Sequence, residues 1–420
     1  MNLADMLCYA DIADLKKIAD TYGCPSESHS KNELIQTILS TIQRRDVMES
    51  RVESMTNSEL RFLNSLLFEN RNAYSLEELK ARALEPSPPG GQANSARKDL
   101  PVAPTPAAGA KAKPKSGKAK KPAPLPPSPE ESARQSIVRF KNYGWLFNGF
   151  SQQTRALFQV PEDVKTGLCD ALEHRYRHVL EAAEDPQAYR DERGLLADDA
   201  VYFLRFVRDY GPAITSEGVM YKRQLAQVLD LLSVGESLPA QAGWRFGYGR
   251  HFRDYPDRFS LLYDFVYYEG FVSESPDGYL AITPGGNEVA AGHAAPDPAK
   301  MYRFWLRLYK GAIPNLSSLA QWIARLSGEW ITIDSLRPAM LPLIRQYYYD
   351  TPESIFEHRV LKMLMHLGIL QWGTTADGRQ VARATPQGKK LVAGHGLVFE
   401  DAIALESGPA SGRQTGFRRI

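Results

Sequence analysis

The sequence predicts a mainly α fold with small β-hairpins, built from repeated modules, and two observations lead to this prediction. Apolar residues recur at helical spacing from Phe259 to Tyr268, and the helix should end at Gly270. Two short strands are expected at 271–273 and 279–283, around a turn at 275–278, and Thr283 then caps a helix that begins with Pro284. The same pattern returns at 353–395, where Gly368, Asp377-Gly378, Thr385-Pro386-x-Gly388 and Gly394-His395 match Gly270, Asp277-Gly278, Thr283-Pro284-x-Gly286 and Gly292-His293.

Helix, hairpin and helix in this order form the second half of a winged-helix module. We therefore expect tandem winged-helix modules, preceded by a helical hairpin at residues 1–45. At 420 residues the chain is too long for one core, so two to four domains are expected.

Composition limits the location and class of the protein. No apolar run approaches the roughly 18 residues of a membrane span, and acidic residues interrupt the N-terminal apolar stretch, so we expect neither a membrane segment nor a signal peptide. The 3 cysteines form no CxxC pair, which favours a reducing compartment. We expect a cytoplasmic protein, and association with a bacterial nucleoid fits this location.

The net charge of +2 is unevenly distributed. Between Glu85 and Glu130 we count eight Lys or Arg against three Asp or Glu, a net +5, so the remaining residues sum to −3. The segment 85–131 is rich in Pro, Ala, Gly and Lys and is expected to be a disordered insertion. It serves either as a cationic arm that binds polyanions or as a spacer. Its lysines are Lys111, Lys113, Lys115, Lys118, Lys120 and Lys121.

Residues 1–45 read as two helices joined by an extended connector. Leu15, Ile18 and Ala19 mark the first, and Ser30 with Glu33 predicts a capping box for the second. The positions Leu15, Ala19, Gly23, Ser30-Lys31, Leu34 and Ile38 resemble the SAP and Rho N-terminal families. This resemblance implies binding to DNA or RNA, with Lys16, Lys17 and Lys31 as the phosphate contacts. The alternative is a small hairpin that only packs on its neighbour.

Residues 46–84 plus 132–198 are predicted to form the first winged helix, with 85–131 inserted between its second and third helices. Thr56 and Ser75 cap two helices, and a third helix at 132–143 carries Arg134, Arg139 and Lys141. Strands are expected at 144–150 and 155–160, and Pro161 should open the closing helix.

Residues 199–299 are predicted to form the second winged helix. Ala213-Ile-Thr-x-x-Gly218-x-x-x-Lys222-Arg223-x-Leu225, followed by the hairpin described above, resembles the helicase-associated N-terminal domain of bacterial XPB-type helicases. The resemblance implies that the chain binds DNA, with Lys222 and Arg223 as contacts. It also implies a helicase or another DNA-processing protein as a partner. The motor is absent, since the chain contains no GxxxxGK[ST] and lacks the length for two ATPase domains.

Residues 300–407 are predicted to be a helical segment and a third winged helix, followed by a flexible tail at 408–420. We expect helices at 317–330, 335–350 and 353–367. Because the third helix of a winged helix usually reads DNA, its exposed face is informative. The third module offers His358, Arg359, Lys362 and His366 there, whereas the second offers Ser260, Asp264 and Glu269 and is expected to serve packing or a partner.

Two further patterns have competing interpretations. Aromatic and cationic residues alternate in 243–258. Their side chains either stack on bases and neutralise phosphates or complete a hydrophobic core, and the core interpretation is favoured. His174 and His178 are one turn apart, but no third ligand is evident, so a solvated basic face is preferred over a zinc site.

No nucleophile–base pair, catalytic carboxylate pair or cofactor loop is present, so we expect no enzyme, no cofactor, no metal and no small-molecule substrate. The sequence predicts a non-catalytic protein that binds DNA largely without sequence preference. The alternative is a protein–protein scaffold that uses winged helices without touching DNA.

Overall fold

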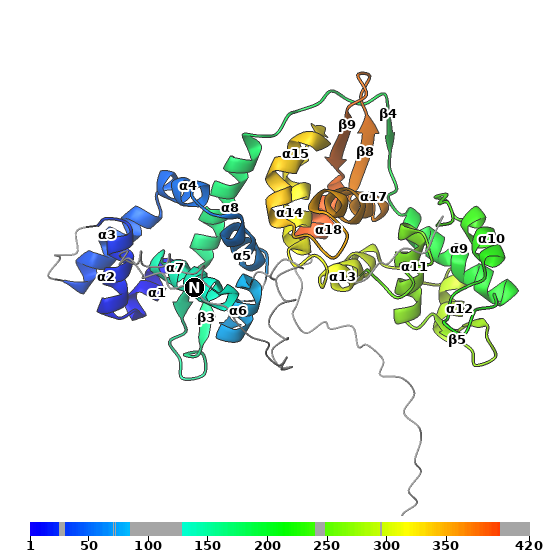
Figure 1. The fold of residues 1–420 in the computed structure, drawn as a ribbon, viewed down its shortest axis with the longest axis horizontal. Helices are drawn as coiled ribbons and strands as arrows, with labels where there is room; N and C mark the ends of the chain where they lie inside the picture. Colours follow the sequence, from blue (N-terminus) through cyan, green and yellow to red (C-terminus); the bar gives the residue numbers. More distant parts are fainter. Residues whose placement is uncertain are drawn as a thin grey trace, which may run out of the picture. The chain divides into compact units, whose positions relative to one another are not determined.

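The computed structural model describes residues 1–24, 30–69, 71, 73–84, 128–239, 248–294 and 296–394. The described chain is mainly helical and carries three small antiparallel sheets (Figure 1). It divides into two compact units: unit 1 comprises Met1–Ile42 and Ala73–Val164, and unit 2 comprises Gln43–Asn72 and Lys165–Ile420. The mainly α class with small β-hairpins is therefore confirmed.

Unit 1 begins with three short helices and continues into a small sheet with two helices. Its elements are α1 (Leu3–Tyr9), α2 (Ile12–Thr21), α3 (Lys31–Ile42), β1 (Tyr74–Ser75), α6 (Leu76–Ala83), α7 (Pro129–Asn142), β2 (Phe147–Asn148) and β3 (Leu157–Gln159). The last helix, α8 (Glu162–Arg177), begins here after Pro161, as predicted, and continues into unit 2.

Both helices predicted in residues 1–45 are present, and α1 precedes them. Leu3, Met6 and Leu7 of α1 are buried at helical spacing. This helix is too short for periodicity to identify it from sequence. At the start of α3 the Ser30 hydroxyl accepts a hydrogen bond from the Glu33 N–H at 3.4 Å, in the direction that the predicted cap requires.

The three-stranded sheet of unit 1 joins segments from both sides of residues 85–127. Its order is β1-β3-β2, with Tyr74 opposite Phe158 and Phe147 opposite Gln159. The helices that flank the gap, α6 and α7, pack against each other. The insertion itself lies outside the described residues, but the elements before and after it belong to one unit.

Unit 2 holds the remaining helices and two sheets. Its first half contains α4 (Arg45–Glu53), α5 (Asn57–Leu67), most of α8, β4 (Ala188–Arg190), α9 (Leu195–Tyr210), α10 (Lys222–Leu231), α11 (Asp257–Tyr268), β5 (Val272–Glu274), β6 (Leu280–Ile282) and α12 (Pro284–Ala290). Its second half contains α13 (Pro298–Tyr309), α14 (Leu316–Leu326), β7 (Ile331–Thr332), α15 (Ile333–Met340), a 3-10 turn (Leu341–Leu343), α16 (Pro352–Ser354), a π-helical segment (Ile355–Leu361), α17 (Lys362–His366), β8 (Leu370–Thr374), β9 (Gln380–Ala384) and α18 (Pro386–Gly394).

The helix–hairpin–helix pattern that recurs in the sequence recurs in the structure with the same hydrogen bonds. In the first copy the Thr283 hydroxyl accepts from the Gly286 N–H at 3.1 Å and donates to the Gly270 carbonyl at 2.7 Å. In the second copy Thr385 does the same with Gly388, at 2.9 Å, and Gly368, at 2.9 Å. One threonine thus ties a helix start to the turn that precedes the hairpin.

The glycines of this repeat are required by geometry. Gly270 and Gly368 have φ of 72° and 70°, a left-handed conformation that side chains rarely adopt. A Cβ on Gly286 would lie 2.1 Å from the Phe271 carbonyl oxygen, and one on Gly388 would lie 2.5 Å from that of Ile369. In each copy two backbone segments cross here so closely that no side chain fits between them.

The second hairpin is part of a larger sheet than predicted. Its order is β4-β8-β9-β7, so β4 and β7 flank the hairpin formed by β8 and β9. Tyr189 of β4 lies opposite Gly373, whose missing side chain leaves room for Pro186. Residues 188–190 were predicted to belong to the first module and instead extend this sheet.

Two predicted helices differ in their details. The helix expected at 335–350 ends after the 3-10 turn at Leu343, and Ile344 is extended. Pro338 and Pro342 supply no N–H to a helix, which explains the early end. The helix expected at 353–367 is present, but residues Ile355–Leu361 are π-helical.

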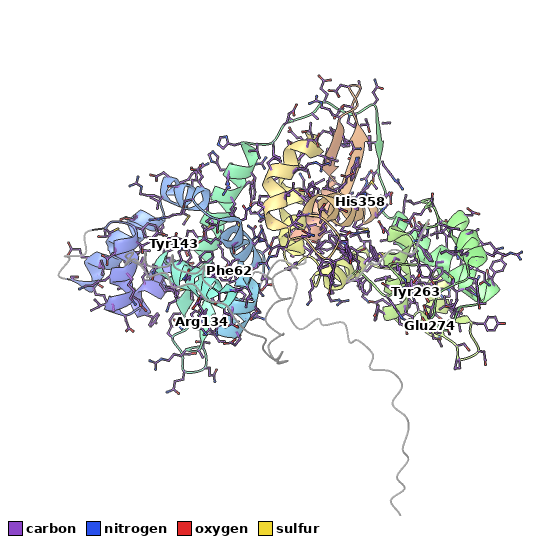
Figure 2. The ribbon with its side chains drawn as sticks, in the orientation of Figure 1. Phe62, Arg134, Tyr143, Tyr263, Glu274 and His358 are labelled. Atoms are coloured by element: carbon purple, nitrogen blue, oxygen red, sulfur yellow. The ribbon has the colours of Figure 1, made fainter. Side chains whose placement is uncertain are left out.

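Helix α5 packs in unit 2 through a buried polar contact. The Asn64 side-chain oxygen accepts from the Trp322 indole N–H at 2.6 Å, and the Ser318 hydroxyl donates to the Asn64 carbonyl at 2.6 Å. Phe62, on the same helix, is also buried (Figure 2). The predicted first module, 46–84 plus 132–198, therefore contributes to both units.

Candidate nucleic-acid interface

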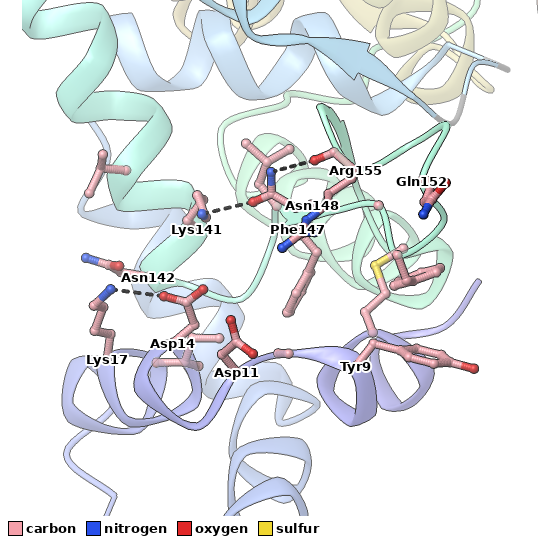
Figure 3. Close-up of a pocket in the computed structure, with 17 residues that line it drawn as sticks. Tyr9, Asp11, Asp14, Lys17, Lys141, Asn142, Phe147, Asn148, Gln152 and Arg155 are labelled. Atoms are coloured by element: carbon pink, nitrogen blue, oxygen red, sulfur yellow. Dashed lines mark hydrogen bonds and ion pairs between the residues drawn. The ribbon is translucent and has the colours of Figure 1, made fainter.

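Unit 1 contains a groove of about 830 Å³ between the first two helices and the α7–β2–β3 segment. In Figure 3 one wall is formed by α1 and α2, and the facing wall by the end of α7 and the β2–β3 hairpin. The groove is lined by cationic, amide, carboxylate and aromatic side chains, which include Lys17, Lys141, Arg155, Asn142, Asn148, Gln152, Asp11, Asp14, Tyr9 and Phe150.

Three cations from distant parts of the sequence meet at this groove. Lys17 lies on α2 and pairs with Asp14 at 3.0 Å, while Lys141 donates to the Asn148 side-chain oxygen at 3.1 Å. Lys141 lies in the last turn of α7, where a cation is stabilised by the helix dipole. The Arg155 guanidinium is exposed and has no hydrogen-bond partner within the described ranges. All three side chains thus line one groove, and Arg155 is the one of the three without a partner among the described residues.

Two exposed aromatic rings lie in contact at one end of the groove. Tyr9, the last residue of α1, is 65% exposed and Phe150 is 37% exposed. Their ring centroids are 4.6 Å apart with an interplanar angle of 32°. Large aromatic side chains left open to solvent at a polar groove often mark a binding surface.

The loop that carries Phe150 is held by its own hydrogen bonds. The Ser151 and Thr154 hydroxyls are 2.7 Å apart, and the Arg155 N–H donates to the Ser151 carbonyl at 2.8 Å. A Cβ on Gly149 would lie 2.5 Å from the Thr154 carbonyl oxygen, so the loop closes on a glycine. Phe150 and Arg155 are thus presented from a defined turn.

A carboxylate without a partner faces the cations. Asp11 precedes α2 but its side chain makes no cap hydrogen bond, and it has no other partner in the part of the chain that the structure describes. Figure 3 shows its carboxylate pointing into the groove. The nearby Asp14–Lys17 pair is exposed on both sides and contributes little to stability.

The predicted contacts of unit 1 fall into two groups. Lys16 and Lys17 on α2 and Arg134 and Arg139 on α7 are exposed. Arg134, which is labelled in Figure 2, lies two helical turns before Lys141 and therefore on the same face of α7. Lys31 is half-buried and donates to the Cys8 carbonyl at 2.8 Å, so it also holds α3 to α1.

Among the lining residues that sequence reasoning missed are Tyr9, Asp11, Phe150 and Arg155. An exposed Phe in a turn between two short strands was the available signal for Phe150 and Arg155. No signal pointed to Tyr9, because α1, the helix that carries it, had not been predicted. Asp11 precedes the predicted helix α2, but nothing in the sequence placed it at a groove.

In unit 2 the predicted contacts are more dispersed. Lys222 and Arg223 are exposed at the start of α10. Lys362 and His358 line a small cavity of about 260 Å³ together with Arg190, Glu357, Met365 and Trp372. Figure 2 shows His358 on the helix beside the β8–β9 hairpin.

Arg359 is not a surface contact. It is only 4% exposed, pairs with Asp257 at 2.8 Å and lies over the Phe252 ring at 4.3 Å. We correct its predicted role, because a buried and paired guanidinium is not available to a phosphate. His366, expected on the same face, is buried as well and contacts Glu192 at 2.8 Å.

Helix α11 is buried on almost every side, in contrast to the predicted exposed face. Ser260 and Asp264 are buried, and Glu269 is half-buried. The preceding loop behaves as the favoured core interpretation predicts, since Tyr248, His251 and Phe252 are all buried. Trp244, Arg245 and Phe246 lie outside the described residues.

A buried charge network links α9, α11, α17 and the segment after β4. Arg258 pairs with Asp199 at 2.6 Å and with Glu192 at 3.3 Å, and all three side chains are at most 1% exposed. The pKa of Glu192 lies below its usual value. Burial alone would raise this pKa, but the hydrogen bond with His366 and the charges of His366, Arg190 and Arg258 outweigh burial. The cavity beside Glu192 and His366 measures only about 20 Å³, so the network is structural.

The histidine pair on α8 contacts a glutamate. His174 Nδ1 lies 3.0 Å from Glu49, and the His174 and His178 rings are 4.4 Å apart. Over the described ranges no group of three or more His, Cys, Asp or Glu side chains is placed to hold a metal ion.

The predicted lysine arm, Lys111, Lys113, Lys115, Lys118, Lys120 and Lys121, and the tail at 408–420 lie outside the described residues. No helix in the described part of the chain is long and apolar enough to cross a bilayer. Comparison of the chain with protein-family models, curated proteins and solved structures found no match.

Proposed function

We propose that this chain is a non-catalytic DNA-binding protein that binds largely without sequence preference, through the groove of unit 1. The observation that carries the proposal is the meeting of Lys17, Lys141 and Arg155 with the exposed Tyr9–Phe150 pair. Cations neutralise phosphates and aromatic rings stack on bases, and neither interaction depends strongly on sequence.

The lysine arm strengthens this proposal through its position in the chain. It connects α6 and α7, and α7 forms part of the groove wall. A cationic arm joined to the start of α7 would add phosphate contacts to those of the groove. In this proposal the arm raises affinity, while the groove provides the geometry.

We also propose that the repeated helix–hairpin–helix units are winged helices of the helicase-associated type, as their resemblance to XPB-type helicases implies. Their matched Thr–Gly hydrogen bonds support a common unit. The copy that contains α11 acts as a brace rather than a reader, because its third helix is buried. A helicase or another DNA-processing protein is the corresponding partner.

The scaffold alternative rests on the apolar character of part of the groove. Val138, which is 54% exposed, lines the groove together with Tyr9 and Phe150, and Asp11 and Asp14 reduce the positive charge. A protein segment could use the same features. DNA binding is favoured because Arg155 and Lys141 lie on the same wall with amide side chains that also bind phosphates and bases.

The test is a fluorescence-anisotropy titration of the full chain with labelled DNA at low salt. We expect binding, and we expect the double variant Lys141→Ala/Arg155→Ala to bind at least tenfold more weakly, since each lost charge contact is worth about 1 kcal/mol. The control Arg208→Ala/Lys300→Ala removes the same charge from exposed sites of unit 2 and should bind as the parent does.

A third variant separates the groove from the arm. It replaces Lys111, Lys113, Lys115, Lys118, Lys120 and Lys121 by Gln in the full chain. We expect weaker binding that still responds to the groove substitutions. Absence of binding by the parent at low salt would refute the proposed function, and loss of all binding in the glutamine variant alone would move the function to the arm.

A further inference from the structure

We infer that the groove of unit 1 takes a single strand of DNA or RNA, stacks a base on Tyr9 and Phe150, and uses Asp11 to prefer bases that carry an exocyclic amino group. This inference rests on the proposed nucleic-acid binding and specifies its ligand. It follows from the volume of the groove, its aromatic pair and the unpartnered carboxylate.

The groove is suited to unstacked bases. In a duplex the bases are stacked on each other, so a flat aromatic side chain cannot lie against a base face without extruding it. Tyr9 and Phe150 are open to solvent on a groove of about 830 Å³, which has room for a short stretch of single strand. Stacking of this kind tolerates any base, because every base has an aromatic face.

The two walls of the groove carry different chemistry. The wall formed by α7 and the β2–β3 hairpin carries Lys141 and Arg155, while the facing wall carries Asp11 and the paired Asp14 and Lys17 (Figure 3). A strand that lies along the groove would place its phosphates at the cationic wall. Its bases would then point towards Tyr9 and Asp11.

Asp11 gives the groove its preference. A carboxylate accepts hydrogen bonds only, so it favours the amino groups of cytosine, adenine or guanine over the carbonyl oxygens of thymine or uracil. Asp14 is already paired with Lys17, whereas Asp11 has no partner among the residues described. A free carboxylate in a phosphate-binding groove costs affinity unless it contacts a donor on the ligand.

The experiment compares labelled dC and dT oligonucleotides of equal length, and a duplex, in anisotropy titrations of the full chain. We expect dC to bind about threefold to tenfold more tightly than dT, as one base-edge contact allows. We also expect both to bind more tightly than the duplex at the same salt.

Two variants separate base recognition from charge. Asp11→Asn should tighten binding to dT and not to dC, because the amide donates to the thymine carbonyl and no longer accepts as a carboxylate. The control Asp20→Asn removes the same charge from an exposed position of α2 outside the groove, and should affect both oligonucleotides equally. The double variant Tyr9→Ala/Phe150→Ala should weaken single-strand binding about fivefold or more.

Equal affinity of the parent for dC and dT, or equal effects of Asp11→Asn and Asp20→Asn, would overturn the role of Asp11. Unchanged single-strand affinity in the Tyr9→Ala/Phe150→Ala variant would overturn the stacking. In both cases the chain still binds DNA and the proposed function stands. No binding to any of the three DNAs would instead refute the proposed function, and the inference with it.

Discussion

Burial shifts the pKa values of two residues in opposite directions: His251, in the loop before α11, and Asp264, on α11. His251 lies against the Tyr255 and Tyr263 rings, with centroids 5.3 and 5.4 Å away, and burial beside Arg250 lowers its pKa to about 4. Asp264 accepts from the Arg250 N–H at 2.9 Å, and burial raises its pKa to about 7. Both residues are therefore held neutral over part of the ordinary pH range.

His251 should make unit 2 sensitive to acid. The pKa of His251 is about 4 in the folded protein and 6.5 in the unfolded chain. Its contribution to the free energy of unfolding is therefore fully present above pH 6.5 and is lost as the pH falls towards 4. We expect a loss of up to about 3 kcal/mol over this range. Urea unfolding from pH 7 to pH 4 should show a smaller decline for His251→Phe, which keeps the ring contacts. An identical decline in both proteins would contradict this assignment.

Asp264 should act in the other direction. The pKa of Asp264 is about 7 in the folded protein and 3.8 in the unfolded chain. Its contribution to the free energy of unfolding is therefore fully present below pH 3.8 and is lost as the pH rises through 7. We expect Asp264→Asn to be more stable than the parent at pH 8 and to lose this advantage at pH 4. Unfolding free energies at the two pH values decide the matter, and a variant that is less stable at both would show that the charged carboxylate is tolerated.

At the scale of elements, the repeated hairpin unit depends on a close backbone crossing. The Phe271 carbonyl accepts from the Thr283 N–H at 3.0 Å, and the Ile369 carbonyl accepts from the Thr385 N–H at 2.9 Å. The same two carbonyls face Gly286 and Gly388. The same residues therefore repeat in the sequence because both copies use the same arrangement of hydrogen bonds.

Substitution of either glycine should be strongly destabilising. We expect Gly286→Ala and Gly388→Ala each to lower the unfolding free energy by about 2 kcal/mol or more, because the new Cβ would meet backbone oxygen. The matched control is Gly285→Ala, whose Cβ would make only ordinary contacts at 3.9 Å and which should be neutral or slightly stabilising. Urea unfolding of the three variants tests this, and equal stability of Gly285→Ala and Gly286→Ala would contradict it.

The buried charge network is a second prediction at this scale. Arg258→Met should destabilise unit 2 by about 3–5 kcal/mol, since it leaves Asp199 and Glu192 buried without their common partner. Arg208→Met, which breaks an exposed pair with Asp209, should cost less than about 1 kcal/mol. Similar losses for the two variants in chemical denaturation would show that the network contributes little.

At the scale of the whole molecule, sequence reasoning identified most helices, because capping residues and apolar spacing are local signals. Thr56 and Ser75 cap their helices by accepting from the N–H groups of Glu59 and Glu78, and both hairpins lie where the turns predicted them. It could not assign β4 to the sheet of β8 and β9, or α5 to unit 2, because these depend on contacts distant in sequence. Burial of Arg359 was hidden for the same reason, since its partner Asp257 lies on another helix.

The candidate site shows the same limit. Lys17 and Lys141 were predicted separately, one in the N-terminal hairpin and one on the third helix of the first module. Only the fold brings them to one groove with Arg155, and only α1 places Tyr9 beside Phe150. Some residues of the groove could thus be predicted from the sequence, whereas their position next to one another depends on tertiary structure.

The most direct test of DNA binding in the groove is the salt dependence of single-strand affinity. Affinity of the parent and of Lys141→Ala/Arg155→Ala would be measured by anisotropy at several salt concentrations. Each phosphate contact on a single strand contributes a slope of about −0.7 to log K against log salt, so the double variant should have a slope smaller in magnitude by about 1.4. Equal slopes for the two proteins, or no binding by the parent at low salt, would contradict the account.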